Sequence, residues 1–428
     1  VCEKEQAVGV IGPNERGFNT TIGSQFELPL NDTSCINCGQ CINVCPVGAL
    51  QEKSDIDKII DAINDPTKHV VVQTAPAVRA SIAEEFGYPI GTNGEGKMIA
   101  ALKAIGFDKV FDTNFAADIT IMEEATELIE RITKKGVLPM ITSCSPGWIR
   151  YIENYYPDLI PHLSTCKSPQ QMFGAVVKTY YAKKNKLDPK DIVSVSVMPC
   201  VAKKYEIHRK DQNAAGKGIP DVDYTMTTRE LGRLIKRFMI NWEYLDDKNA
   251  KFDDPLGESS GAAVIFGTTG GVMEAALRTA SDILTGKNNK DVEYKDVRGM
   301  KGIKEAIYEI KKGLDVKVAI ASGTANAKVL MEKIKNGEAD YHFIEIMGCP
   351  GGCINGGGQP QVPGYIRNTV DYKKKRADVL YKIDKANKNR KSHKNKAVDV
   401  LYKEFFKEPG SHLAHEVLHT SYEKRDWT

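Results

Sequence analysis

The sequence predicts an α/β protein with mostly parallel sheets flanked by helices, preceded by a small cysteine-rich domain. Strand-like and helix-like segments alternate between about residues 69 and 362, which is typical of parallel sheets wrapped by helices. The first 55 residues are rich in Cys and Gly and lack long periodic runs. We therefore expect three regions: a small domain at 1–55, a central domain at 56–362 and a polar, helical extension at 363–428.

The central domain contains five segments with strand-like patterns. They cover 69–78, 137–144, 191–200, 315–323 and 340–349. Residues 121–136 form an amphipathic helix pattern that ends at a glycine. Three strand patterns end at a cysteine, namely Cys144, Cys200 and Cys349. Because ligands of open α/β sheets bind outside the carboxyl ends of the strands, we expect these cysteines to meet.

The composition excludes some classes of function. Lys and Arg number 59 against 56 Asp and Glu, so the net charge implies neither a nucleic-acid nor a membrane-surface partner. No apolar run reaches the length of about 18 residues that a membrane span needs. The ten cysteines fall in metal-type spacings and isolated positions, which predicts a reducing compartment such as the cytoplasm. The composition does not indicate an oligomeric state.

The first metal-binding pattern is the stretch CINCGQCINVCP. It places Cys35, Cys38, Cys41 and Cys45 in the order C-x₂-C-x₂-C-x₃-C-P, which is the bacterial ferredoxin run for a [4Fe–4S] cluster. Zinc is the alternative metal, but zinc sites favour two separated pairs over three cysteines in seven residues. The first domain is therefore predicted to be ferredoxin-like.

The fourth ligand of this cluster is predicted to be Cys2. In two-cluster ferredoxins the last cysteine of each run binds the other cluster, so Cys45 would serve a second [4Fe–4S] cluster. Cys2 would then be the last cysteine of an earlier run. Because the sequence begins at Val1 rather than Met, we expect an N-terminal truncation, which leaves a lost signal peptide open.

The second pattern joins distant cysteines. The stretch MGCPGGCINGGGQP adds Cys353 to Cys349 in a glycine-rich loop that can approach a bulky ligand closely. One large cofactor bound by Cys144, Cys200, Cys349 and Cys353 explains these positions together. Cys166 stays open at this stage, because a lone cysteine is often a small buried apolar residue.

These loops resemble a known family. The stretches TSCSPGW, MPCVAKKYE and EIMGCPGGCINGGGQP are similar to the three signature loops of [FeFe]-hydrogenases, and QTAPAVR, KSPQQMFG and GTTGGVMEAALRT support the match. The resemblance implies a catalytic H-domain with an H-cluster, which is a [4Fe–4S] cubane joined to a diiron subsite with CO, cyanide and azadithiolate ligands. It implies reversible formation of H₂ from protons and electrons. An external electron carrier such as ferredoxin and maturation proteins for the subsite would be partners.

The resemblance also implies residue roles. Cys353 would bridge the cubane and the diiron subsite, Cys200 and Cys349 would bind the cubane, and Lys203 would donate to a cyanide. Residues lining the diiron pocket would be Ala75, Pro76, Gln170, Met198 and Met347. A proton route would pass through Cys144, Glu124, Ser164 and Glu127. The two glutamates lie three residues apart and share a helix face, although simple solvent exposure is the alternative.

Ser145 departs from the family pattern, which has a second cysteine there as a cubane ligand. Ser145 could bind iron as an alkoxide, Cys144 could take the ligand role, or the loop could have a different register. A non-catalytic or sensory homologue of the family is therefore the alternative to an enzyme.

Two further features are open. The basic segment 372–396 is either a solvated helix face with a linker or a docking patch for an acidic carrier. His412, His415 and His419 are spaced for one helix face, with a surface or interface role favoured over zinc binding.

Overall fold

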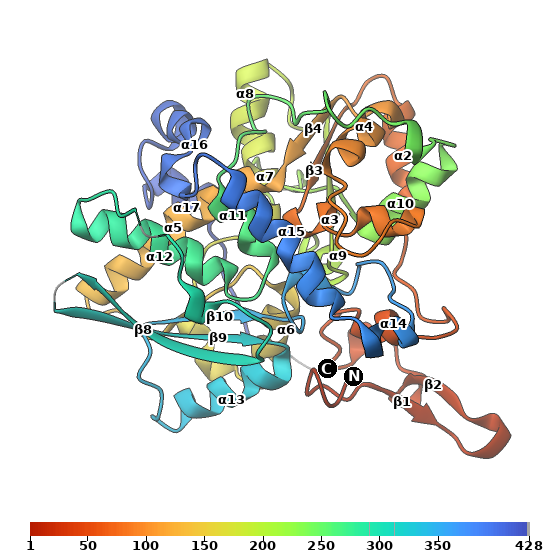
Figure 1. Cartoon of the computed structure of the whole chain (residues 1–428), viewed down its shortest axis with the longest axis horizontal. Helices are drawn as coiled ribbons and strands as arrows, with labels where there is room; N and C mark the ends of the chain where they lie inside the picture. The colour runs from red at the N-terminus through yellow and green to blue at the C-terminus, as the bar shows by residue number, and fades with distance from the viewer. Residues whose placement is uncertain (291, 312, 426–428) are drawn as a thin grey trace.

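The computed structural model describes residues 1–290, 292–311 and 313–425, and its centre contains two four-stranded sheets (Figure 1). The first sheet has the order β4-β3-β6-β7 and is parallel throughout. Its strands are β3 (His69–Thr74), β4 (Lys109–Asp112), β6 (Ile192–Met198) and β7 (Tyr224–Thr227). Strand β6 is buried along its whole length, as expected for a parallel strand covered on both faces.

The second sheet has the order β5-β10-β9-β8. Its strands are β5 (Met140–Ile141), β8 (Ile303–Lys311), β9 (Leu314–Ser322) and β10 (Phe343–Met347). Strands β5, β10 and β9 are parallel, whereas β8 forms an antiparallel hairpin with β9. Together the two sheets confirm the predicted α/β class with mostly parallel sheets.

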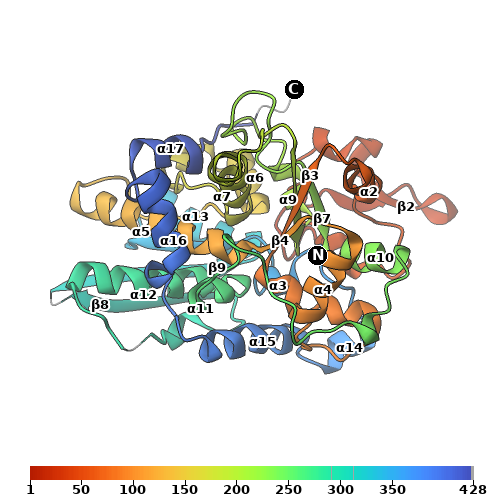
Figure 2. The same cartoon turned by 90° about the horizontal axis from the view of Figure 1, so that it is seen from above.

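Helices cover both sheets (Figures 1 and 2). Their bounds are α1 (Gln40–Val44), α2 (Ile56–Asn64), α3 (Pro76–Arg79), α4 (Glu95–Ile105), α5 (Thr113–Thr133), α6 (Pro146–Tyr155), α7 (Pro169–Val176), α8 (Ala182–Asn185), α9 (Ala202–Glu206), α10 (Thr228–Arg237), α11 (Gly261–Val264), α12 (Gly271–Thr285), α13 (Thr324–Lys335), α14 (Gly364–Thr369), α15 (Tyr372–Ala386), α16 (Lys396–Leu401) and α17 (His412–Leu418). Helices α2, α4 and α10 share a buried apolar cluster with the first sheet. The second sheet packs against α5 and α12 through one cluster and against α6 and α13 through another.

Three predicted elements differ clearly in length from the observed ones, and one of them, the predicted strand at 137–144, shortens to the two residues of β5. The predicted strand at 69–78 stops at Thr74, because Pro76 occupies the first turn of α3, where a proline is well accommodated. The predicted helix at 121–136 is the second half of α5, which starts eight residues earlier at Thr113. Asp112 caps this start by accepting a hydrogen bond of 3.0 Å from the Asn114 backbone N–H.

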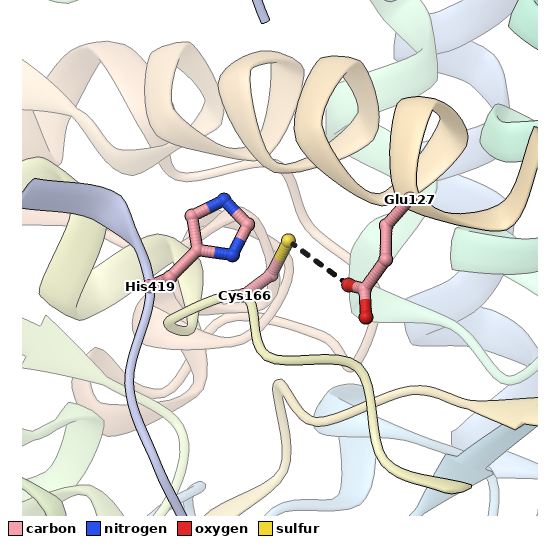
Figure 3. A group of neighbouring side chains, drawn as sticks. All are labelled: Glu127, Cys166 and His419. Carbon is pink, nitrogen blue, oxygen red and sulfur yellow. Dashed lines mark hydrogen bonds between the residues drawn. The ribbon is translucent and has the colours of Figure 1, made fainter. Parts of the chain in front are cut away.

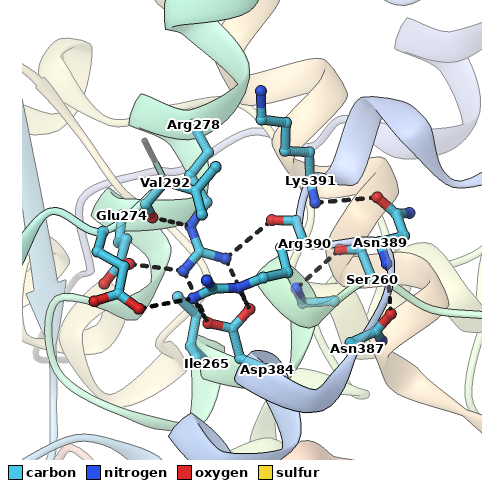
Figure 4. Close-up of polar contacts among 12 residues, drawn as sticks. Ser260, Ile265, Glu274, Arg278, Val292, Asp384, Asn387, Asn389, Arg390 and Lys391 are labelled. Carbon is cyan, nitrogen blue, oxygen red and sulfur yellow. Dashed lines mark hydrogen bonds and ion pairs between the residues drawn. The ribbon is translucent and has the colours of Figure 1, made fainter. Parts of the chain in front are cut away.

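A buried ion network holds the C-terminal segment to the central domain (Figure 4). Arg278 of α12 lies 2.7 Å from Glu274 and 2.9 Å from Asp384 of α15, and all three side chains are at most 1% exposed. Arg390 adds a second contact to Asp384 at 2.6 Å. The basic segment is therefore not simply a solvated face: Arg376 and Lys391 are also buried, and they pair with Glu84 and Asp282.

The N-terminal region is a short hairpin, β1 (Ile11–Asn14) and β2 (Thr21–Ser24), followed by the cysteine loop and α1. It presses against the glycine-rich loop of the central domain. A Cβ atom on Gly357 would lie only 2.0 Å from the Cys38 carbonyl oxygen, so this contact requires a glycine. Arg229 of α10 spans the boundary, with hydrogen bonds of 2.6 Å to Glu52 and 2.7 Å to the Gly357 carbonyl.

Among the residues that the structure describes, no helix combines the length and the apolar character that crossing a bilayer requires.

Candidate functional site

The predicted second cysteine group comes together at one cavity between the two sheets. Strands β3, β5, β6 and β10 all end at its edge. The cavity volume is about 80 Å³. Its lining includes all of the predicted ligand and pocket residues, Ala75, Pro76, Cys144, Gln170, Met198, Cys200, Lys203, Met347, Cys349 and Cys353, together with Ser145.

Glycines let the MGCPGGCINGGGQP loop close this cavity. A Cβ atom on Gly356 would lie 2.0 Å from the Pro199 carbonyl oxygen, a distance that excludes any side chain there. Gly352 has φ of 96° and packs against the Thr269 backbone, so it needs both the left-handed conformation and the missing side chain. The loop therefore brings Cys349 and Cys353 against the strand end that carries Cys200.

The thiols of this cavity are electrostatically suited to a metal cluster. Burial is the main cause that raises the pKa of Cys200, Cys349 and Cys353, and the Cys200 thiolate would raise the other two further. The pKa of Cys353 is about 12. Several buried thiolates are unfavourable without a cation, and soft sulfur donors suit iron–sulfur clusters. The donor set thus fits the predicted H-cluster.

Lys203 is fixed at the rim of the cavity by one carboxylate. Its Nζ donates to Glu206 at 2.8 Å and to the Cys144 carbonyl at 3.1 Å. Glu206 also accepts from Gln170 at 3.1 Å and from the Ser168 hydroxyl at 2.8 Å. The sequence interpretation did not assign Glu206 a role, although its place three residues after Lys203 on α9 could have suggested one.

Cys144 and Ser145 occupy different surroundings in the cavity. The pKa of Cys144 is raised by burial first and by the charge of Glu124 second, and Lys203 and Cys353 also act on it. The Ser145 Oγ atom accepts a hydrogen bond of 3.0 Å from the Gly348 N–H, beside Cys349. Cys144 therefore borders the acidic helix α5, whereas Ser145 borders the loop that carries the other cysteines.

The residues of the predicted proton route are close to one another but incompletely connected. The Ser164 hydroxyl donates to Glu127 at 2.8 Å, and Arg131 pairs with Glu127 at 2.7 Å. Glu124 is 1% exposed, and neither of its carboxylate oxygens has a hydrogen-bond partner among the described residues. Burial, helped by the charge of Glu127, raises the pKa of Glu124 to about 8, so this carboxyl is mostly protonated at neutral pH.

The first cysteine group lies beside the same cavity. Burial raises the pKa of Cys35 and Cys41, and the charges of neighbouring cysteines, including Cys2, add to the rise. The pKa of Cys38 is raised by burial and then by Cys349 of the central domain. Cys45 faces the backbone N–H groups of residues 47–50, which lower its pKa. These neighbours match the predicted grouping of Cys2 with the first three cysteines, and the ligand roles stay a prediction.

The fold places His419 beside Cys166 and His415, whereas His412 lies apart from them at the surface. Cys166 is completely buried. The side chain of His412 is 91% exposed, whereas that of His419 is 7% exposed and lies beyond the end of α17. The single helix face that was predicted for the three histidines is therefore wrong, because the helix ends at Leu418 and His419 continues in extended backbone.

Comparison with known families agrees with this site. Residues 68–357 match the model of the C-terminal domain of the iron-only hydrogenase large subunit, residues 370–425 match the iron hydrogenase small subunit, and residues 28–51 match a 4Fe-4S binding domain. The chain belongs to the iron-only, or [FeFe], hydrogenase family. This membership confirms the resemblance of the signature loops and the predicted cofactors, an H-cluster and [4Fe–4S] clusters.

Individual relatives support the same conclusion. Iron hydrogenase 1 of Clostridium pasteurianum is 50% identical over 96% of this chain and 71% of its own length. The NADP-reducing hydrogenase subunit HndD of Solidesulfovibrio fructosivorans is 48% identical over 99% and 72%. The structure of apo [FeFe]-hydrogenase HydA1 from Chlamydomonas reinhardtii aligns with a TM-score of 0.76 at 42% identity, covering 87% of this chain and 99% of that one.

The family also contains relatives with other names. The cytosolic iron-sulfur assembly component 3 of Bos taurus is 30% identical over 92% of this chain. A periplasmic hydrogenase large subunit of Nitratidesulfovibrio vulgaris is 49% identical over 79% of it.

Proposed function

We propose that the chain is a hydrogenase that catalyses the reversible reaction of protons and electrons to H₂. The observation that carries this proposal is the shared cavity, where four cysteines, Lys203 and two methionines meet at the ends of four strands. When bound, the H-cluster would supply the diiron subsite at which protons and electrons combine. Cys200, Cys349 and Cys353 would hold it.

The side chains that line the cavity would orient the bound group and set the charge and polarity around it. Lys203 would present its ammonium group to an anionic ligand such as cyanide, because Glu206 fixes its position from the side. Gln170, whose amide donates to Glu206 and to the Lys203 carbonyl, would line the same pocket in a fixed orientation. Met198 and Met347, each 3% exposed, would form an apolar and polarizable wall that keeps water out.

Proton delivery is proposed through Cys144, Glu124, Ser164 and Glu127. The proposal is supported by the Ser164 to Glu127 hydrogen bond and by a carboxyl at Glu124 whose pKa of about 8 suits proton exchange near neutral pH. Rotation of the Glu124 side chain between Cys144 and Ser164 would complete the route.

Electron supply is proposed through the N-terminal cluster. Cys38 is close enough to Cys349 for its charge to act on it, and its carbonyl packs on Gly357, so electrons from an external carrier such as ferredoxin would enter beside Cys35 and Cys41. Separate maturation proteins would install the diiron subsite. Ten free cysteines favour a reducing compartment, and we propose the cytoplasm, although one similar protein is named as periplasmic.

The proposal is tested on anaerobically matured protein by infrared spectroscopy and by an H₂ assay. We expect CO and cyanide bands and H₂ evolution from a reduced viologen dye. Protein that carries its full iron complement but gives neither the bands nor H₂ would refute the hydrogenase function.

A second candidate is a non-catalytic role in iron–sulfur assembly or sensing. Ser145 favours it, because a hydroxyl stands where the family pattern has a cubane thiolate. This candidate predicts a cubane in the cavity without the infrared bands, so the same spectra separate the two functions.

A further inference from the structure

Three side chains with different metal-binding atoms meet outside the cavity (Figure 3). Glu127, Cys166 and His419 each offer one ligand atom, and these atoms lie within 4.8 Å of one another. Figure 3 shows the Cys166 sulfur between the other two side chains, with the Glu127 carboxylate 3.9 Å away. A carboxylate, a thiol and an imidazole together form a donor set that suits zinc.

The backbone fixes two of these ligands in advance. Cys166 and His419 face each other in an antiparallel bridge. On either side of the bridge, the Lys167 N–H donates to the Leu418 carbonyl at 2.8 Å, and the Thr420 N–H donates to the Thr165 carbonyl at 2.8 Å. Because the bridge orders both residues before any metal binds, little conformational entropy is lost on binding.

His419 also has the hydrogen bonding of a metal-ligating histidine. Its Nε2 lies 3.2 Å from the carboxylate of Glu123, and its Nδ1 lies 2.8 Å from the Thr165 hydroxyl. If Nε2–H donates to Glu123, Nδ1 carries the lone pair. A carboxylate behind the histidine fixes its tautomer and makes it a stronger ligand. Rotation of the Thr165 hydroxyl would free Nδ1 for a metal ion.

The local charge favours a cation. Burial and the charges of Glu127, Glu124 and Glu123 raise the pKa of Cys166 well above its ordinary value, so without a metal the sulfur carries its proton. Arg131 is the opposing cation, but it contacts only the Oε1 atom of Glu127 through its guanidinium. The Oε2 atom accepts hydrogen bonds from the Ser164 hydroxyl at 2.8 Å and the Thr165 N–H at 3.2 Å, and it is the carboxylate oxygen 3.9 Å from the Cys166 sulfur.

One member of this group, His419, borders a surface groove. A groove of about 530 Å³ is lined by Thr165, His415 and His419, among other residues. The ring of His415 packs on that of His419 with a centroid distance of 4.1 Å. A zinc ion could enter here, and a water molecule from the groove would be its fourth ligand.

We propose that Glu127, Cys166 and His419 form an inhibitory zinc site. Binding of Zn²⁺ releases the Cys166 thiol proton to solvent and engages the Oε2 atom of Glu127. The bound ion then competes with the Ser164 hydroxyl for that oxygen and puts a positive charge on the proton route. The inhibition rests on the proposed hydrogenase function, whereas the zinc binding does not.

The binding is tested on cluster-loaded protein equilibrated with zinc sulfate and then desalted. We expect one tightly bound zinc per chain, with X-ray absorption at the zinc edge showing one sulfur at about 2.3 Å and otherwise nitrogen and oxygen. Cys166→Ala should lose the sulfur signal, and His419→Gln should weaken binding at least tenfold. The control His412→Gln removes an exposed histidine of α17 and should bind zinc like wild type.

The inhibition is tested by H₂ evolution with added zinc sulfate. We expect at least a tenfold loss in wild type and in His412→Gln, little loss in Cys166→Ala, and no effect of magnesium sulfate, since Mg²⁺ does not favour sulfur ligands. A zinc coordination shell without sulfur in wild type would overturn the proposal. So would zinc binding and inhibition in Cys166→Ala that equal those of wild type. Wild type without H₂ activity would instead refute the proposed function, and the absorption spectra would still decide the zinc site.

Discussion

At the scale of single residues, Ser145 is the position where this chain differs most consequentially from its family. Its hydroxyl lines the cysteine cavity and accepts the Gly348 N–H at 3.0 Å. An alkoxide is a harder donor than a thiolate and suits iron–sulfur iron less well. A cysteine at this place would therefore complete a set of sulfur ligands beside Cys349.

Ser145→Cys is expected to strengthen cluster retention. During incubation with an iron chelator, the variant should lose cavity iron several-fold more slowly than wild type, and its reduced cubane should give an altered electron paramagnetic resonance signal. The control Ser143→Cys adds a thiol at a nearby hydroxyl that contacts the Cys166 carbonyl and does not line the cavity. Identical retention and identical spectra in Ser145→Cys would show that residue 145 does not contact iron.

Glu124→Gln is expected to slow H₂ turnover by about 10²-fold or more, because the amide cannot exchange a proton as the buried carboxyl does. Turnover with a reduced dye is the measurement, with the cluster signals recorded on the same sample. Glu130→Gln is the matched control, since Glu130 lies on the same helix but is exposed and pairs with Lys134. Undiminished turnover in Glu124→Gln would exclude the proposed route.

Asp118→Asn is expected to remove one pH dependence of stability. Burial raises the pKa of Asp118 to about 6, although Ser260 and Asn395 donate hydrogen bonds to it. Because the folded pKa exceeds the unfolded value of about 3.9, the folded state binds this proton more tightly. The stabilisation is complete below about pH 4 and is lost as the pH rises through about 6.

From pH 5 to pH 7, the free energy of unfolding of wild type should therefore fall by about 1 kcal/mol relative to that of Asp118→Asn. Thermal unfolding of the two proteins at each pH measures this difference. Asp61→Asn removes an exposed carboxylate of α2 and should follow wild type. Parallel pH curves for wild type and Asp118→Asn would contradict the assignment.

At the scale of elements, buried ion pairs rather than surface ion pairs hold α15 against α12. Breaking a buried ion pair by removing one partner costs about 3–5 kcal/mol, because it leaves an uncompensated charge. Exposed pairs contribute about 1 kcal/mol or less. The buried Arg278 and the exposed Lys374–Asp378 pair of α15 provide both cases in one protein.

Arg278→Met is expected to destabilise the protein by about 3–5 kcal/mol, because Glu274 and Asp384 lose their shared cation. The thermal midpoint at matched cluster content should fall by several degrees, and the C-terminal segment should become more sensitive to protease. Lys374→Met should leave both measurements almost unchanged. Arg298 also pairs with Glu274, at 2.7 Å, and Arg390 pairs with Asp384 at 2.6 Å. An unchanged midpoint for Arg278→Met would show that these two arginines compensate for the loss.

At the scale of the whole molecule, the N-terminal region and the central domain are joined at the glycine-rich loop beside the cavity. Arg229 donates to Glu52 on one side and to the carbonyls of Gly357 and Gln359 on the other. This joint places the first cysteine group against Cys349, so it governs the proposed electron path.

Arg229→Met is expected to increase amide hydrogen exchange several-fold in residues 1–55 and in the glycine-rich loop, because the acceptors on both sides of the joint lose one shared donor. Exchange followed by mass spectrometry measures this change in cluster-loaded protein. The control Arg237→Met removes an exposed pair with Asp57 and should leave exchange at the joint as it is in wild type. Unaltered exchange in Arg229→Met would show that backbone packing alone holds the regions together.

The sequence by itself determined the family, the α/β class and the cysteine sets, because these depend on local spacing and on which loops follow strands. That Cys200, Cys349 and Cys353 share one cavity could be predicted since their loops are contiguous motifs, and their ligand roles stay a prediction. Three features could not be predicted in this way. They are the role of Glu206, the buried ion network of Asp384, and the burial of Arg376 in a segment that was expected to be exposed. Their partners lie in other elements, and periodicity says nothing about distant partners.

Only the tertiary structure decided that Glu127, Cys166 and His419 meet. In the sequence, Cys166 is a lone cysteine and His419 is one of three histidines on an expected helix face. Helix α17 ends at Leu418, so His419 has an extended backbone conformation. The bridge to Cys166 then places His419 next to α5. The physical reason is that packing of distant elements sets which side chains share a site, whereas sequence spacing sets only which residues share an element.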